Sequence, residues 1–157
     1  MRHRVLPVAL ALLANCAQAA DIDLSAGASA TVGVRWTQVL FLDAAIDTHE
    51  VAGLHWQPTG TLGWIGSRGD RFDDLDHDVL IAGAGVRLVD WWGGAFLGFE
   101  GAYANQRTDA LSSHEQFITS LGWQGKRFVF LIRHISNGDL FGGRNLGETM
   151  LLAGLHF

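Results

Sequence analysis

The chain has 157 residues, a single cysteine and a formal net charge of −5 at pH 7. It has no lysine or arginine cluster long enough to follow a phosphate backbone, which excludes nucleic acid as a predicted partner. The only cysteine, Cys16, lies in the predicted leader, so we do not expect a disulfide to hold the fold together. The length suits one compact domain.

The first residues have the three parts of a secretory signal peptide. Two arginines precede an apolar run at residues 5–14, and small residues follow it. The run is shorter than the ~20 residues that a spanning helix needs, which favours cleavage over a membrane anchor. A lipoprotein signal at Cys16 is the alternative, although Asn15 stands where a small residue is expected. We predict a leader at residues 1–20 and one folded domain at residues 21–157.

The folded domain has the weak sequence signature of a transmembrane β-barrel. Its apolar residues come in stretches of about ten, separated by polar or glycine-rich turns. The chain has 20 glycines and only 2 prolines, as expected of many short strands with tight connections. We predict eight strands, at residues 22–32, 34–44, 50–66, 77–89, 94–105, 114–124, 126–136 and 147–157.

Turns and periodicity support this assignment. Turn signals stand at residues 66–70, in the acidic segment 73–76, at Gly93-Gly94 and at Gln124-Gly125. A helix is disfavoured because apolar positions repeat at every second residue, and an even number of strands is what a single-chain bacterial barrel requires. The sequence therefore predicts an all-β fold, an eight-stranded antiparallel transmembrane β-barrel.

Aromatic residues and the last strand point to the outer membrane. The six tryptophans lie mostly near predicted strand ends, and Trp91-Trp92 is the best candidate for an interfacial girdle. From tryptophan placement alone, core aromatics of a soluble sandwich are an equal alternative. The segment 150–157 alternates apolar residues and ends on Phe157, which resembles the C-terminal strand of outer-membrane proteins. Pairing of this strand with the first would close the barrel.

The last two predicted strands carry residues suited to acyl transfer. His134 and Ser136 are two apart, so on a strand they share a face, with like atoms about 6.5 Å apart. Glu148 begins the neighbouring strand, where a hairpin would bring its carboxylate beside the imidazole. An imidazole can take the serine proton near neutral pH, and Asn137 and Gly138 could donate to a developing oxyanion. Taken alone, these residues are explained better by a strand-end histidine followed by a Ser-Asn-Gly turn than by catalysis.

A resemblance to a known family favours the catalytic interpretation of this segment. The segment 134–138, His-Ile-Ser-Asn-Gly, with Glu148 in the following strand, resembles the active-site segment of PagL-type lipid A 3-O-deacylases. The resemblance implies a Ser-His-Glu triad on an eight-stranded outer-membrane barrel, with Ser136 as nucleophile, His134 as base, Glu148 as orienter and Asn137 assisting the oxyanion. It implies lipid A of lipopolysaccharide as substrate, hydrolysis of its 3-O-linked acyl chain, and no cofactor or metal.

Two details do not follow the expected pattern. In the family an asparagine precedes the glutamate by about four residues, whereas Asn145 precedes Glu148 by three and Arg144 holds the other place. If Phe157 faces lipid, strict alternation puts Glu148 on the inner face, whereas the apolar residues Phe128, Phe130 and Ile132 predict that His134 and Ser136 face outward. We therefore predict an irregularity between residues 147 and 154, either a β-bulge or a strand that starts only after Glu148, that brings Glu148 to the face of His134.

Other charged residues have simpler interpretations. Asp76-His77-Asp78 suggests a metal site, but no standard ligand spacing is present, and an acidic surface loop explains it better. Arginines on or near strands are predicted to line or cap the barrel interior, paired with residues such as Glu100. These arginines are Arg35, Arg87, Arg107 and Arg133. Arg107 and Arg144 have a second interpretation, contact with lipid A phosphates.

The predicted function is thus that of a serine esterase in the cell outer membrane. Two alternatives stay open: a non-enzymatic structural or adhesive small barrel, and a soluble lipocalin-like carrier. Whether the barrel forms a homodimer is also open.

Overall fold

The structure is a computed structural model that describes residues 21–31, 36–69, 75–137 and 146–157. The predicted leader and residues 144 and 145 lie outside these ranges. Within them the chain forms nine strands, β1 (Asp21–Ala30), β2 (Trp36–Ala45), β3 (His49–Val51), β4 (Leu54–Ile65), β5 (Val79–Val89), β6 (Ala95–Ala104), β7 (Glu115–Gln124), β8 (Phe128–Asn137) and β9 (Glu148–His156). In the same part of the chain, no helix has the length and apolar character needed to cross a membrane.

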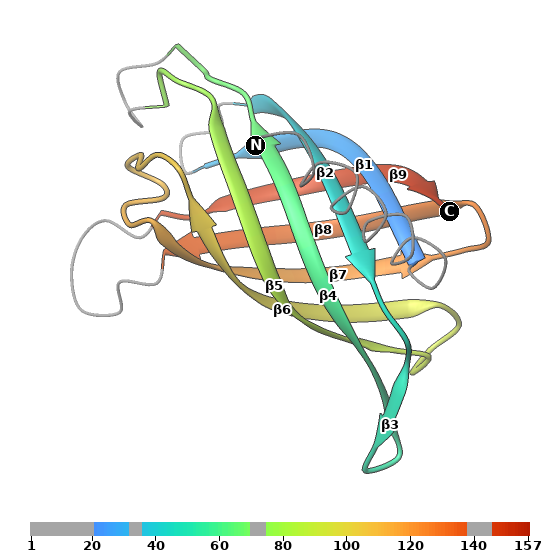
Figure 1. Ribbon diagram of the computed structural model, residues 1–157. Coiled ribbons are helices and arrows are strands. Elements are labelled where there is room, and N and C mark those ends of the chain that lie inside the picture. The colour runs from blue at the N-terminus through green and yellow to red at the C-terminus, as the bar shows by residue number, and fades with distance from the viewer. Residues whose placement is uncertain (1–20, 32–35, 70–74, 138–145) are drawn as a thin grey trace, which may run out of the picture.

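The strands form one closed antiparallel sheet (Figure 1). Strands pair with their neighbours in chain order, except that β2 pairs with β4 in place of β3, and β9 pairs back to β1. At this seam the backbones of Ile22 and Phe157 exchange two hydrogen bonds, of 2.9 and 3.2 Å. Because β3 only extends the β2–β4 hairpin, eight strands make the wall. The predicted eight-stranded antiparallel barrel is confirmed.

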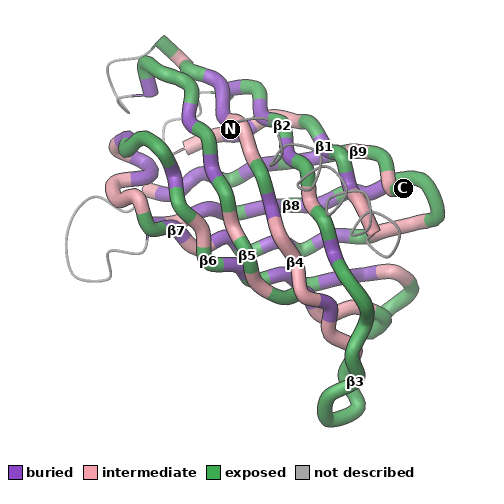
Figure 2. The backbone as a smooth tube through the Cα atoms, in the orientation of Figure 1, coloured by how far each residue is buried: buried purple, intermediate pink, exposed green. Residues whose placement is uncertain are grey.

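The predicted strand at residues 50–66 is the one that the structure divides. Ala52 and Gly53 adopt positive φ angles of 55° and 77°, which makes a tight two-residue turn inside the predicted strand. β4 therefore begins at Leu54, and β3 pairs back on it along Val51↔Leu54. Figures 1 and 2 show this exposed hairpin standing out from one end of the barrel.

The two ends of the barrel differ in their connections. Residues 66–69 and 75–78, between β4 and β5, and the connection 105–114 lie at one end, which we call the loop rim. The short turns 90–94 and 125–127 lie at the other, the turn rim, together with the β3 hairpin. β8 runs from the turn rim to the loop rim, so its last residues stand at the loop rim.

The outer wall is apolar. On β8, Phe128, Phe130 and Ile132 are 54%, 50% and 50% exposed, whereas Val129 and Leu131 between them are buried. The same alternation recurs on other strands, where green and purple follow each other in Figure 2. Large apolar side chains on the outside include Leu24, Leu40, Leu42, Leu62, Leu80, Val86, Leu97, Phe99, Leu121, Leu151 and Leu155. An apolar outside of this extent is the pattern of a barrel built for lipid rather than for water.

Aromatic side chains stand near both ends of this apolar wall. Trp91, Trp92 and Trp123 are exposed at the turn rim, and Trp36 and Tyr103 are exposed near the loop rim. The Trp123 indole donates a hydrogen bond of 2.8 Å to the Gly93 carbonyl, which fixes its ring against the turn. These positions are where girdle residues are expected.

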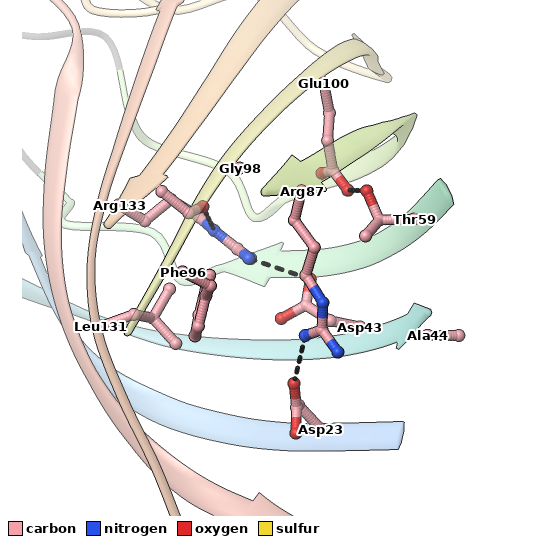
Figure 3. Close-up of a pocket in the computed structure, with 11 residues that line it drawn as sticks. Asp23, Asp43, Ala44, Thr59, Arg87, Phe96, Gly98, Glu100, Leu131 and Arg133 are labelled. Atoms are coloured by element: carbon pink, nitrogen blue, oxygen red, sulfur yellow. Dashed lines mark hydrogen bonds and ion pairs between the residues drawn. The ribbon is translucent and has the colours of Figure 1, made fainter. Parts of the chain in front are cut away.

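Two arginines occupy the middle of the barrel (Figure 3). Arg87 donates to Asp23 at 3.1 Å and to Gln57 at 2.6 Å. Arg133 donates to Asp43 at 2.9 Å and to Ser120 at 3.0 Å. The predicted interior positions of Arg87 and Arg133 are therefore confirmed, with aspartates as their partners.

Glu100 has partners other than the predicted arginines. It accepts hydrogen bonds from Thr59 at 2.6 Å and from Thr61 at 2.7 Å. Arg107 does not reach the interior, since it is exposed in the connection 105–114, and Arg35 lies outside the described residues.

Apolar side chains fill much of the remaining interior. Leu75 and Leu111, which belong to the connections at the loop rim, pack onto a cluster that includes Phe41, Ile118 and Met150. The cavity left at the middle of the barrel measures about 20 Å³, room for about one water. As far as the described residues show, the interior is thus a packed core and not a lipid-carrying cavity, which disfavours the lipocalin-like alternative.

Candidate active site

His134 and Ser136 lie on the outer wall near the loop rim. Both belong to the end of β8, a strand in which even-numbered residues point outward and odd-numbered residues point inward. His134 is exposed and Ser136 is partly buried. The sequence therefore predicted their shared outward face correctly.

The His134 imidazole has two neighbours from the β9 side. Its Nδ1 lies 3.0 Å from the Thr149 hydroxyl, and the two residues are register partners. Gly147 lies against the other side of the ring, because a Cβ added there would stand 2.5 Å from Cε1 and 2.8 Å from Nε2. Thr149 and Gly147 together define the place of the imidazole.

Ser136 stands opposite Phe117 of β7 in the sheet register. Among the hydrogen bonds of the described residues, none joins Ser136 to His134. The two side chains lie two residues apart on one face, about 6.5 Å between like atoms, so a side-chain rotation has to bring hydroxyl and imidazole together. The pair is aligned but not yet in contact.

Glu148 does not contact His134. It faces the interior opposite Ile135, is 1% exposed, and accepts two hydrogen bonds from Arg68, of 2.8 and 2.6 Å. Ser29 donates a further hydrogen bond to the same carboxylate. A buried carboxylate is stabilised where a guanidinium can bind both of its oxygens, and that place is inside the barrel.

The irregularity predicted in β9 is wrong, both as a β-bulge and as a strand that starts after Glu148. From Glu148 to Leu155 the strand pairs with β8 without interruption, and from Thr149 to His156 it pairs with β1 in the same way. Two continuous ladders leave no extra residue to turn Glu148 outward. The irregular backbone stops at Gly147, whose φ is +65°.

The predicted oxyanion residues are not gathered beside Ser136 either. Asn137 is 2% exposed and points inward, where its amide donates a hydrogen bond to Ser112. Its side chain is therefore on the wrong face for a group attacked by Ser136, for the same reason of alternation. Gly138 lies outside the described residues.

Three residues near the hairpin were missed at the level of sequence. Thr149 and Gly147 follow from the register of β9 once the bulge is removed. Arg68 carries no sequence signal, because it belongs to an irregular connection and enters the barrel only through the fold. Its side chain is 2% exposed.

Asp78, at the end of the acidic connection after β4, holds the end of β4 and the residues that follow it through hydrogen bonds. Asp78 accepts hydrogen bonds from the Ser67 backbone N–H at 2.9 Å and from the Trp64 indole at 3.0 Å. These donors stabilise the carboxylate and hold the pKa of Asp78 below its usual value. His77 lies 2.5 Å from Asp76, and both are exposed. Within the described ranges, no three His, Cys, Asp or Glu side chains gather as metal ligands would.

A polar cavity opens at the turn rim, on the opposite end from His134. It measures about 280 Å³ and is lined by groups such as Asp21, Gln57, Arg87 and Gln124. Its lining suits water or a small polar solute and not an acyl chain. The outward face of β8 is therefore the better candidate for lipid chemistry.

No protein-family model matches the chain, and no curated protein matches its sequence. Among solved structures, it is similar to the crystal structure of Ail, the attachment invasion locus protein of Yersinia pestis. The TM-score is 0.43 at 15% sequence identity, over 88% of this chain and 97% of that one. A likeness at this level does not extend to activity or partners.

Proposed function

We propose that this barrel resides in the outer membrane and hydrolyses the 3-O-linked acyl chain of lipid A, with Ser136 as nucleophile and His134 as base. The observation that carries the proposal is the outward position of both residues on a wall that is mostly apolar. An ionisable side chain on such a face suggests a functional site, because burying it in lipid is costly. The resemblance of segment 134–138 to lipid A deacylases supplies the substrate.

The place of the pair suits this substrate. Bacterial barrels carry their longer connections on the extracellular side, which assigns the loop rim to the outer surface. His134 and Ser136 then stand at the level of the outer leaflet, where the ester linkages of lipopolysaccharide lie between sugar and acyl chains. The substrate reaches them from within the membrane and does not need to enter the barrel.

The reaction follows the general scheme of serine esterases. As the Ser136 oxygen bonds to the ester carbonyl carbon, His134 takes the hydroxyl proton. The bond between the carbonyl carbon and the sugar oxygen breaks, and the imidazolium returns the proton to that oxygen. Water, deprotonated by His134, then attacks the acyl-serine, which releases a fatty acid and restores Ser136.

Thr149 supports the tautomer that this scheme needs. With Nδ1–H donating to the Thr149 hydroxyl, Nε2 carries the lone pair that accepts the serine proton. A threonine orients the ring without supplying negative charge. We assign Glu148 the separate task of holding the hairpin from inside through Arg68.

The test is the lipid A of cells that express the chain. Mass spectrometry should show loss of the 3-linked acyl chain with the wild-type protein and no loss with Ser136→Ala. Ser113→Ala, in the connection before β7, is the matched control and should act as wild type. Continued deacylation by Ser136→Ala would refute the assignment.

One observation favours a second candidate, a non-enzymatic structural or adhesive barrel. The carboxylate of the expected triad is inside the wall, bound to Arg68 and Ser29. For such a barrel, lipid A would keep its 3-linked chain in cells that express the folded wild-type protein.

A further inference from the structure

A row of register partners leads away from Ser136 across the outer wall. Ser136 on β8 stands opposite Phe117 on β7, Phe117 opposite Gly101 on β6, and Gly101 opposite Ala84 on β5. All four residues are at least partly exposed on the outside. The row therefore continues the surface on which the proposed nucleophile lies.

This row descends from the loop rim toward the middle of the wall. Ser136 is the penultimate residue of β8 at the loop rim, and Phe117 is the third residue of β7 from that rim. Gly101 is fourth from the loop-rim end of β6, and Ala84 is sixth from that end of β5. In the opposite direction, across β9, the row rises to Gly147 at the rim. Only the path through β7 leads from the headgroup level toward the apolar centre of a membrane.

Stacked aromatic rings border the row. Phe99 stacks on Phe117 with ring centroids 5.6 Å apart, and Tyr103 stacks on His114 at 5.2 Å. On β6, Phe99 and Tyr103 are the outward neighbours of Gly101 on its two sides, and they are 53% and 57% exposed. Their stacking partners hold the rings in place, so they flank the space over Gly101.

No contact with the described residues requires a glycine at position 101. A Cβ added there meets none of their heavy atoms within 4 Å. At Gly85 on the neighbouring strand, by contrast, it would stand 2.1 Å from the Phe99 carbonyl oxygen. Gly101 also lacks the positive φ that marks a conformational need for glycine. What it provides is open space beside Phe117.

We infer that Phe117, Gly101 and Ala84, between Phe99 and Tyr103, seat the acyl chain of the ester that Ser136 attacks. The inference rests on the proposed esterase function and extends it to chain length. With strands about 4.8 Å apart, Gly101 lies roughly 10 Å from Ser136. A long fatty acyl chain reaches Gly101, whereas a short one ends before it. Gly101 is thus a determinant of chain-length specificity.

The experiment compares two esters on the purified full barrel in detergent micelles. Gly101→Phe fills the open space, so kcat/KM for p-nitrophenyl laurate should fall at least about tenfold. This fall corresponds to losing the contact of roughly two methylene groups of the acyl chain. Hydrolysis of p-nitrophenyl acetate should stay at the wild-type rate. Gly101→Ala should retain both activities, and heat-dependent migration on a gel checks that each variant is folded.

The matched control adds the same ring elsewhere on the wall. Ala26 points outward on β1, the strand farthest around the barrel from β6, so Ala26→Phe should leave both rates unchanged. An unchanged laurate-to-acetate ratio in folded Gly101→Phe would overturn the acyl-chain path. Hydrolysis of both esters by Ser136→Ala would instead overturn the esterase function itself, so the two failures are distinguishable.

Discussion

The two faces of the β8–β9 hairpin offer a direct comparison. The register pair His134–Thr149 lies on the outer wall with an exposed imidazole, and the next pair, Ile135–Glu148, lies inside with a carboxylate only 1% exposed. One step along the strand moves a side chain from a lipid-facing surface into a packed polar core. Adjacent residues therefore have different tasks: proposed chemistry outside and stability inside.

Neutralising the inner carboxylate is the change with the largest expected effect. Glu148→Gln removes the negative charge that binds the buried Arg68 guanidinium through both carboxylate oxygens, which should lower the free energy of unfolding by about 3–5 kcal/mol. Urea unfolding of the folded barrel in detergent measures it. Glu50→Gln on the exposed β3 hairpin is the control and should change stability by less than about 0.5 kcal/mol.

The same variant separates the two tasks proposed for the carboxylate. If stability is unchanged while hydrolysis is lost, Glu148 acts on His134 as a triad member and not on Arg68. The double variant Arg68→Met with Glu148→Met should lose less stability than Glu148→Gln alone, because it replaces both members of the buried ion pair with apolar side chains.

A methyl group at Gly147 should disturb the outer face. In Gly147→Ala the new Cβ would stand 2.5 Å from His134 Cε1, so the ring must move, and kcat/KM should fall by up to about a hundredfold. Gly93→Ala is a close control, since Gly93 also has a positive φ, of 54°, with open space around it among the described residues. Equal activity in the two variants would show that Gly147 does not position the imidazole.

Removing the Thr149 hydroxyl on the outer wall should have a smaller effect on kcat/KM. Thr149→Val keeps the shape of the side chain but loses the hydrogen bond to His134 Nδ1, and kcat/KM should fall about five- to tenfold. Thr119→Val changes the register partner on the other side of His134 and should be neutral, because no hydrogen bond of the described residues joins Thr119 to the ring. A neutral Thr149→Val would remove Thr149 as the orienting residue.

Away from the hairpin, the stability of the loop rim should depend weakly on pH in the acid range. The N–H groups of Ser67 and Trp64 hold the pKa of Asp78 below its usual value, so their contribution to stability is complete above that usual value. It is lost as the pH falls through the lowered pKa. Asp78→Asn should remove this part of the acid dependence, measured as the free energy of unfolding against pH. An identical acid profile in wild type and variant would contradict the contact.

Alternation along the strands was predictable from the sequence, and the site was predictable only in part. The run from Phe128 to His134 predicted both the strand and its outward residues, because a period of two fixes the face of each side chain. The same rule placed Glu148 inside. The irregularity that the family resemblance required, to bring Glu148 beside His134, is absent from β9. Arg68 could not be found in this way, since it lies outside the strands, where no period fixes the direction of a side chain. The Ala52-Gly53 turn was missed because it lacks the usual Asn-Gly or Asp-Gly pair.

The most direct measurement is the reactivity of the outer-wall serine. A fluorophosphonate probe, applied to the folded barrel in detergent, reacts with a serine hydroxyl that a neighbouring base activates. Peptide mapping should find the label on Ser136 in the wild-type protein and no label there in His134→Ala. A wild-type Ser136 that stays unlabelled, or one that reacts equally without His134, would contradict an esterase site on this wall.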